Sequence, residues 1–156
     1  MAAGLRIDYL SNHPEVLPIL TGWFEAEWAS YYGPGGRGDA QDDLATYANG
    51  TKLPVGIVAF LNNDICGIAA LKAESINTHS HLSPWAAAAM VHPDHRGRGI
   101  GTELIRAVED EAKRHGYKHI YCGTSTATHL LERRGWRLME QVPYDGENVS
   151  IYAKAL

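Results

Sequence analysis

The sequence contains no long hydrophobic run and no excess of basic residues. A transmembrane helix needs roughly 20 consecutive apolar residues, and no stretch of this chain approaches that length. Lysines and arginines number 14 against 18 aspartates and glutamates, which gives a net charge of −4 with neutral histidines. General nucleic-acid binders are usually basic. We therefore expect neither a membrane nor a nucleic acid among the partners.

Cysteine is also scarce, since the chain has only Cys66 and Cys122. Both lie in strand-like runs, which favours buried, reduced thiols, with a disulfide between them as the alternative. The first residues, from Met1 to Arg6, lack the charged and apolar regions of a secretion signal. These two features together predict a cytoplasmic protein.

The composition is otherwise that of an ordinary globular domain. Hydrophobic residues make up 45% of the 156 positions, which is enough for one substantial core. No internal repeat, low-complexity tract or shift in composition divides the chain. We expect residues 1–156 to form a single domain.

A glycine-rich stretch between a strand and a helix is the most informative part of the sequence. The run from Trp85 to Val91 is strand-like, and the run from Thr102 to His115 has an amphipathic helical pattern. Between them, glycines alternate with larger residues in Arg96-Gly97-Arg98-Gly99-Ile100-Gly101. A glycine-rich turn that opens a helix points free N–H groups at one spot, so we infer a phosphate-bearing ligand.

Two common nucleotide-binding patterns do not fit this stretch. No Gly-Lys-Ser or Gly-Lys-Thr closes the loop as a P-loop requires, and the G-x-G-x-x-G pattern would need glycine at Thr102 or Leu104. The pattern that fits is R-x-x-G-x-G over Arg96–Gly101. It is similar to the acetyl-CoA pyrophosphate loop of the GNAT N-acetyltransferase superfamily. The alternative is a glycine-rich turn with surface arginines.

The order of predicted elements extends this resemblance over the whole chain. Hydrophobic patterns and turn residues predict, in order, a strand at Leu5–Leu10, helices at Glu15–Ser30 and Asp39–Asn49, a hairpin at Val55–Leu71, the strand and helix around the loop, a strand at His119–Cys122, a helix at Thr126–Arg134, and strands at Trp136–Val142 and Val149–Ala155. We expect a loop at Tyr31–Gly38 and a turn at Asp145-Gly146. The order resembles the GNAT fold, a mixed α/β fold whose central, mostly antiparallel sheet has about seven strands with about four helices.

A second motif near the carboxyl end also resembles the family. In Leu130-Leu131-Glu132-Arg133-Arg134-Gly135-Trp136, a short helix runs into a glycine that is followed by an aromatic residue. Many members have a tyrosine four residues before this glycine, where it protonates the leaving thiolate. This chain has Leu131 there, so the resemblance implies that another group or water supplies that proton.

The resemblance implies acetyl-CoA as the co-substrate and gives each cofactor residue a role. Backbone amides from Arg96 through Thr102 hold the pyrophosphate, and the Arg96 and Arg98 side chains add positive charge. The end of the preceding strand pairs with the pantetheine arm and turns one amide toward the thioester oxygen. Thr124 aligns with an asparagine that contacts the arm in relatives, although a local hydrogen bond is its alternative role. The implied cofactor-binding set is Met90, Val91, Arg96, Gly97, Arg98, Gly99, Ile100, Gly101, Thr102 and Thr124.

The general base is not identified by a motif, because Trp85 stands where some members carry a glutamate. The candidates come from the acceptor side. Histidine suits proton removal at neutral pH, which makes His81 a catalytic candidate, and Glu25 on the first long helix is the other. Water is the alternative to both. Trp28, Tyr31 and Trp85 are the aromatic residues that we expect to bind the acceptor.

Some histidine spacings suggest a metal, namely His79-x-His81 and His92-x-x-His95. The loop resemblance accounts for His92 and His95 without a metal, so we expect none.

The resulting hypothesis is transfer of an acetyl group from acetyl-CoA to a primary amine by direct attack in a ternary complex. The alternatives are a non-catalytic acyl-CoA-binding module and an interaction domain that retains the fold. The acceptor is a small-molecule or peptide amine, with polyamines, aminoglycosides, amino acids, protein N-termini and lysines all open. Trp28–Gly33 and Asp145-Gly146 also resemble aminoglycoside 6′-acetyltransferases, over too short a length to select that acceptor. The resemblance is compatible with a homodimer.

Overall fold

A single seven-stranded sheet forms the centre of the computed structural model, which describes residues 4–50, 52–144 and 146–156. The order of strands across the sheet is β1-β2-β3-β4-β5-β7-β6. Neighbouring strands run antiparallel except β4 and β5, which run parallel. The strands are β1 (Leu5–Tyr9), β2 (Val55–Leu61), β3 (Asp64–Lys72), β4 (Trp85–Val91), β5 (His119–Thr124), β6 (Arg137–Tyr144) and β7 (Glu147–Ala155).

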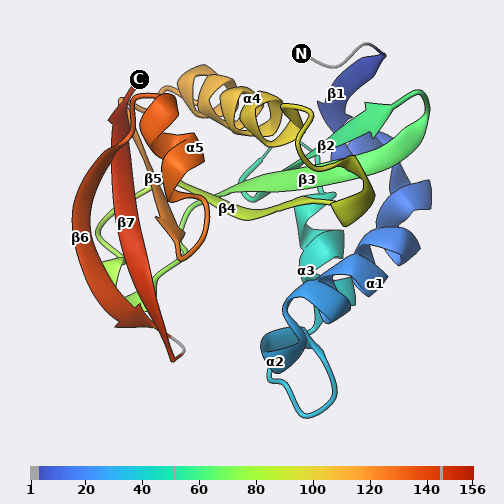
Figure 1. Ribbon diagram of the computed structural model, residues 1–156, viewed down its shortest axis with the longest axis horizontal. Coiled ribbons are helices and arrows are strands. Elements are labelled where there is room, and N and C mark those ends of the chain that lie inside the picture. Colours follow the sequence, from blue (N-terminus) through green and yellow to red (C-terminus); the bar gives the residue numbers. More distant parts are fainter. Residues whose placement is uncertain (1–3, 51, 145) are drawn as a thin grey trace.

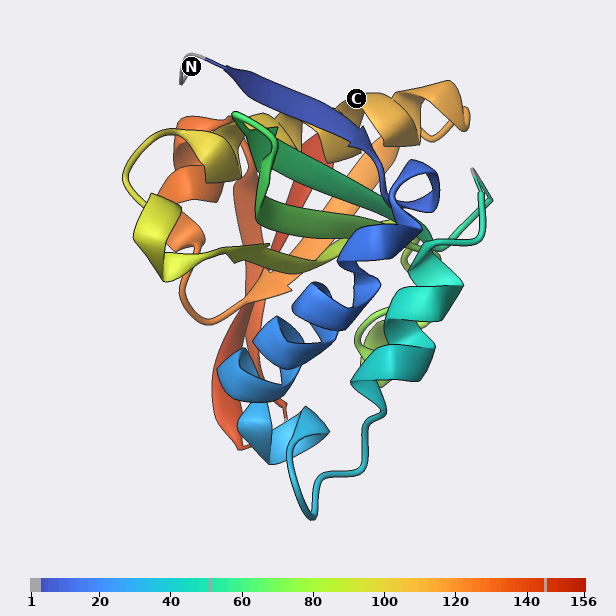
Figure 2. The same ribbon diagram turned by 90° about the vertical axis from the view of Figure 1, so that its right-hand side faces the viewer.

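Helices cover both faces of this sheet. Figure 1 shows α4 and α5 above it and α1 to α3 below it, and Figure 2 shows the same layers from the side. The α-helices are α1 (Leu17–Glu27), α2 (Ala29–Tyr32), α3 (Ala40–Tyr47), α4 (Ile100–Arg114) and α5 (Thr128–Arg133). Short 3-10 turns are η1 (Leu10–Asn12), η2 (Pro14–Val16), η3 (Asn77–His79) and η4 (Pro93–His95).

Each helical layer packs on its own apolar core. Above the sheet, α4 buries a stripe that includes Leu104, Ile105 and Val108 against β2, β3 and β4. Below it, Leu20 and Phe24 of α1 lie in a second cluster with residues of α3 and the strands. All seven residues of β2 are buried, because this strand has helices on both faces.

The two halves of the sheet separate along β4 and β5. Only two residue pairs join these strands, Trp85 with Tyr121 and Ala86 with Cys122. Beyond them, the register between β3 and β4 shifts and Ala88 adopts a left-handed backbone with φ of 54°. Such a β-bulge bends a strand, so β4 turns away from β5 and the two ribbons part (Figure 1).

The predicted mixed α/β arrangement is confirmed, with one revision in the first helical region. The predicted helix at Glu15–Ser30 is interrupted at Trp28, whose φ and ψ are −118° and 53°. Tyr31 lies in α2 and not in the expected loop. In the predicted final turn, Asp145 lies outside the described residues. Within those residues, none of the helices has the length and apolar character needed to cross a membrane.

Both cysteines lie in strands as predicted, and both are free. Cys66 is buried in β3 and its Sγ donates to the Ala59 carbonyl at 3.3 Å. Cys122 in β5 is partly exposed as a residue, but burial of its thiol raises the pKa to about 12.

Candidate functional site

The glycine loop connects η4 to the amino end of α4. Gly97 and Gly99 have φ of 80° and 79°, a left-handed backbone that glycine adopts without strain. Gly99 is the N-cap of α4 and provides no side-chain hydrogen bond. The first N–H groups of a helix have no partner within the helix, so Ile100, Gly101 and Thr102 present theirs beside the positive end of the helix dipole. This geometry suits a phosphate.

The parted end of β4 presents a backbone donor next to this loop. His92 donates its N–H to the Cys66 carbonyl of β3 at 2.9 Å. Adjacent residues of a strand direct their N–H groups to opposite sides, so the Val91 N–H points away from β3. On that side β5 has already separated from β4. The Val91 N–H therefore faces the space between the parted strands.

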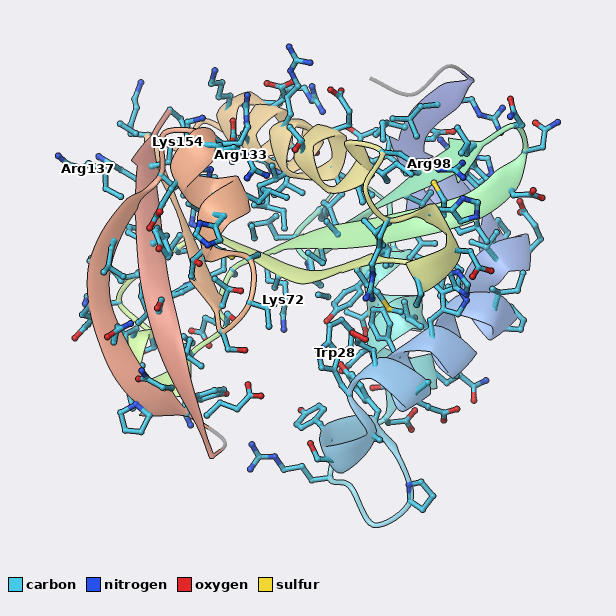
Figure 3. All side chains as sticks on the ribbon, in the orientation of Figure 1. Trp28, Lys72, Arg98, Arg133, Arg137 and Lys154 are labelled. Carbon is cyan, nitrogen blue, oxygen red and sulfur yellow. The ribbon has the colours of Figure 1, made fainter. Side chains whose placement is uncertain are left out.

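The Arg96 side chain is bonded to this end of β4 and forms an ion pair with α1. Its Nε donates to the Val91 carbonyl at 2.9 Å, and its guanidinium lies 3.7 Å from a carboxylate oxygen of Glu27 on α1. Arg98 is exposed on the same loop (Figure 3). Burial raises the pKa of the Cys66 thiol, and the nearby charge of Arg98 opposes that rise. The predicted phosphate contacts of both arginines stay predictions.

Thr124 makes the local hydrogen bonds that were its alternative role. Its Oγ1 accepts from the N–H groups of Thr126 at 3.1 Å and Ala127 at 2.9 Å. A hydroxyl has two lone pairs and one hydrogen, so these bonds occupy the acceptor capacity and leave the O–H able to donate. Thr124 therefore fixes the turn into α5 and keeps one donor for a ligand.

The late motif, Leu130–Trp136, packs against α4 next to the glycine loop. A Cβ at Gly101 would lie 3.1 Å from Leu130 on α5, which shows how closely the two helices approach. Buried Glu109 of α4 accepts from Arg134 at 2.6 Å and from the Trp136 indole at 2.8 Å. Leu131 is 1% exposed and belongs to the core. The position of the usual proton donor is thus apolar and closed to solvent.

An aromatic wall borders the site on the α1–α2 side. Phe24 contacts the rings of Trp28 and Tyr32, with centroids 5.0 and 5.7 Å away. Burial, together with the hydrogen bond that the hydroxyl donates to Asp43, raises the pKa of Tyr32. Tyr31 makes an edge-to-face contact with Tyr32 and is 36% exposed. Trp28 and Tyr31 thus belong to one aromatic group on the α1–α2 side, and their role in acceptor binding stays a prediction.

The segment before β4 packs against β5 and β6. Ile76 lies against Gly123 of β5, and His79 contacts the Glu140 carboxylate of β6. The His81 ring is stacked 5.9 Å from the His79 ring and the residue is exposed. His81 thus lies on the β5–β6 side of the molecule, whereas Glu25 lies exposed on α1.

One sequence expectation about an acceptor residue needs revision. Trp85 is fully buried and donates its indole N–H to the Leu82 carbonyl at 2.7 Å, so it has no surface for an acceptor. On α1, Glu27 lies 3.7 Å from Arg96, and the role of Glu25 as the general base stays a prediction. Lys72 was not singled out by the sequence, yet it points to the α3 side of the sheet (Figure 3), with Nζ 5.9 Å from the Tyr47 ring.

The histidine pairs lie apart from any metal-like cluster. The His92 ring packs on Trp23 with centroids 5.0 Å apart, and His92 and His95 lie 6.1 Å apart. Within residues 4–50, 52–144 and 146–156, no three His, Cys, Asp or Glu side chains come together as a metal site.

Comparison with known proteins supports the interpretation of this loop. The fold is similar to that of yncA from Salmonella typhimurium, described as a putative acetyltransferase and solved with its cofactor acetyl-CoA. The TM-score is 0.76 at 19% identity, and the match covers 97% of this chain and 94% of that one. An aminoglycoside 6′-N-acetyltransferase solved with coenzyme A gives a TM-score of 0.78, with 15% identity over 96% of both chains. The aminoglycoside 6′-N-acetyltransferase of Enterococcus faecium gives 0.75, with 16% identity over 96% of both.

At these identities, the solved structures establish the fold alone. No curated protein matches the chain. The family model described as the acetyltransferase (GNAT) family matches residues 20–136, a range that runs from α1 through the glycine loop to the tryptophan of the late motif. With most of its length in that match, the chain belongs to the acetyltransferase (GNAT) family.

Proposed function

We propose that this chain transfers an acetyl group from acetyl-CoA to a primary amine of a small molecule or peptide, by direct attack of the amine in a ternary complex. One observation carries the proposal. The Val91 N–H faces the space between β4 and β5, directly beside a left-handed glycine loop that opens a 15-residue helix. This combination suits a ligand with phosphates at one end and a carbonyl at the other.

The cofactor side of the reaction depends on backbone groups. Bound acetyl-CoA supplies the acetyl group as an activated thioester. The first-turn N–H groups of α4 hold the pyrophosphate, and the unpaired edge of β4 at Met90 and Val91 aligns the pantetheine arm. The Val91 N–H donates to the carbonyl oxygen as negative charge develops there. A preorganised donor of this kind contributes roughly 2.7–4 kcal/mol to the transition state.

The amine side depends on side chains. An amine arrives mostly as an ammonium ion and must lose a proton before it can attack. Glu27 lies next to Arg96, which is bonded to the end of β4. At this place the Glu27 carboxylate attracts the ammonium form of the acceptor amine. Glu25, His81 or a water molecule then takes the proton. After the attack, the nitrogen gives up its second proton as the carbon–sulfur bond breaks. Since Leu131 is buried and apolar, water passes that proton to the departing thiolate, and the free Thr124 O–H donates to the cofactor arm.

The second candidate function is a non-catalytic acyl-CoA-binding module, which the buried Leu131 favours. Thiol release from acetyl-CoA, measured against a panel of primary amines, separates the two. The proposed activity gives saturable release with at least one amine, and the Gly99→Glu variant abolishes it. Tight CoA binding without release from any amine supports the module. Absence of both binding and release supports an interaction domain.

A further inference from the structure

A hollow in the described part of the chain lies away from the parted strands. Its volume is about 430 Å³, within the size range of small-molecule sites. Three segments surround it: the start of α1 with η2, the turn between β2 and β3, and η4. We name it the α1 hollow.

The floor of the α1 hollow is apolar. It is formed by Val16, Ile19, Trp23, Phe60 and Ile65. Ile19 is 48% exposed, which makes it one of the few large hydrophobic side chains left on the surface. The Trp23 ring lies against His92 with centroids 5.0 Å apart. An apolar floor with an aromatic ring favours a ligand that has an apolar body of its own.

The rim of the α1 hollow is acidic. Glu15, Asp64 and Asp94 stand on its three sides, and their carboxylates are exposed. Glu15 lies 3.3 Å from His13 and Asp94 lies 3.7 Å from His92. The described lining residues include no lysine or arginine, and Arg6 is a cation close to them, with its guanidinium 5.1 Å from the centroid of the Phe60 ring. Three carboxylates around an apolar floor complement a positive charge on an apolar body, and exposed ion pairs of this kind each change affinity about two- to fivefold.

This hollow is separate from the proposed acetyl-transfer site. None of its lining residues comes from α2, β5 or β7. The α1 hollow and the cofactor loop are connected by η4. Asp94 and His95 of η4 line the hollow, and they immediately precede Arg96 in the chain. The Trp23–His92 ring contact forms the wall on that side. We propose that the α1 hollow binds a small organic cation with an apolar body, at the same time as the acetyl-transfer site is occupied.

Benzyltrimethylammonium is a suitable probe, because its quaternary nitrogen has no hydrogen to lose and so cannot be acetylated. The full chain, labelled with ¹⁵N and saturated with CoA, is titrated at pH 8, where ordinary imidazoles are neutral. For a ligand of this size we expect a dissociation constant of about 1 mM. The amides of Asn63, Asp64 and Ile65 should shift, while those of Gly123 and Thr124 should not.

Charge and location are tested separately. Benzyl alcohol and phenylacetate have the ring without the cation, and both should bind at least fivefold more weakly. The double variant Asp64→Asn with Asp94→Asn should weaken the probe about fivefold. The control Asp42→Asn with Asp110→Asn removes the same charge from exposed sites on α3 and α4, and it should leave the affinity within twofold. Ile19→Lys, at an exposed position, should abolish binding without threatening the fold.

Three outcomes overturn the proposal. One is equal binding of benzyl alcohol and the cation. The second is equal loss of affinity in the two double variants, which indicates a general charge effect. The third is displacement of the probe by CoA, or shifts centred on Gly123, which places the probe in the acetyl-transfer site. Each result is independent of whether the chain acetylates any amine.

Discussion

The two sides of the proposed acetyl-transfer site are built from different kinds of group. The cofactor side uses backbone N–H groups of the glycine loop and of Val91, which the glycine conformations and the Ala88 bulge position. The acceptor side uses side chains from α1, α2 and the segment before β4. Backbone geometry tolerates many side-chain changes, whereas a side-chain wall changes with each substitution. The cofactor is therefore easier to infer than the acceptor.

The largest effect on the cofactor side should come from the buried network of charged groups around Glu109 of α4. Glu109 is 4% exposed and accepts from Arg134, Lys154 and the Trp136 indole. The substitution Glu109→Gln leaves both cations without a counter-charge, so we expect a loss of about 3 kcal/mol in unfolding free energy. Urea denaturation measures it. Glu103→Gln on the same helix breaks only an exposed pair with Arg106 at 3.4 Å, and should cost less than about 0.5 kcal/mol. Equal losses would contradict the buried network.

The next effect separates backbone strain from ligand binding. Gly99 and Gly116 flank α4 with φ of 79° and 85°, and neither would meet a neighbour within 4 Å on gaining a Cβ. Gly99→Ala and Gly116→Ala should therefore both cost about 1 kcal/mol of stability. Only Gly99→Ala should also raise the CoA dissociation constant, by about tenfold, since the loop N–H groups would shift. Calorimetric titration with CoA checks this, and similar affinities in the two variants would disprove the loop assignment.

On the acceptor side, Glu27 and Glu25 can be compared directly. Glu27 forms an ion pair with Arg96, and Glu25 does not. We expect Glu27→Gln to raise the KM for the amine about fivefold and to leave the KM for acetyl-CoA within twofold. Steady-state kinetics with both substrates varied measures the two constants. A larger loss of kcat in Glu25→Gln than in Glu27→Gln would favour Glu25 as the base.

The smallest effect should come from Thr124, which has a structural and a proposed binding role. Thr124→Ser keeps the hydroxyl that accepts from Thr126 and Ala127, and should retain activity within twofold. Thr124→Val loses those bonds and the free donor, so kcat/KM for acetyl-CoA should fall about threefold. If Thr124→Val loses thermal stability but keeps kcat/KM, the hydroxyl has only its local role.

The sequence predicted those parts of the fold and site that depend on distinctive residues. Gly97 and Gly99 have a left-handed backbone that few other residues adopt, so their role is visible in the sequence. The stripe of apolar residues on α4 is equally visible. Ala88 has the same kind of backbone, but nothing in an alanine run indicates a bulge.

The acceptor side was harder to predict, because tertiary contacts decide which side chains reach it. Glu25 and Glu27 are two residues apart, and only the rotation of α1 directs Glu27 toward Arg96. Trp85 has an aromatic side chain at a strand end, but the Leu82 segment covers it completely. Lys72 ends a strand like any solvated lysine, and only the sheet topology brings it to the α3 side.

The bulge at Ala88 has a consequence for how this protein could lose activity. Since the donor at Val91 is a backbone N–H, no side-chain deletion removes it. Loss of the donor requires β4 to regain its regular pairing, which one residue fewer in the strand would allow. Deletion of Ala88 or Ala89 should thus re-register the strand against β3 and close the space that the cofactor arm needs. The Val91 donor should therefore depend more on the length of β4 than on any one side chain in the strand.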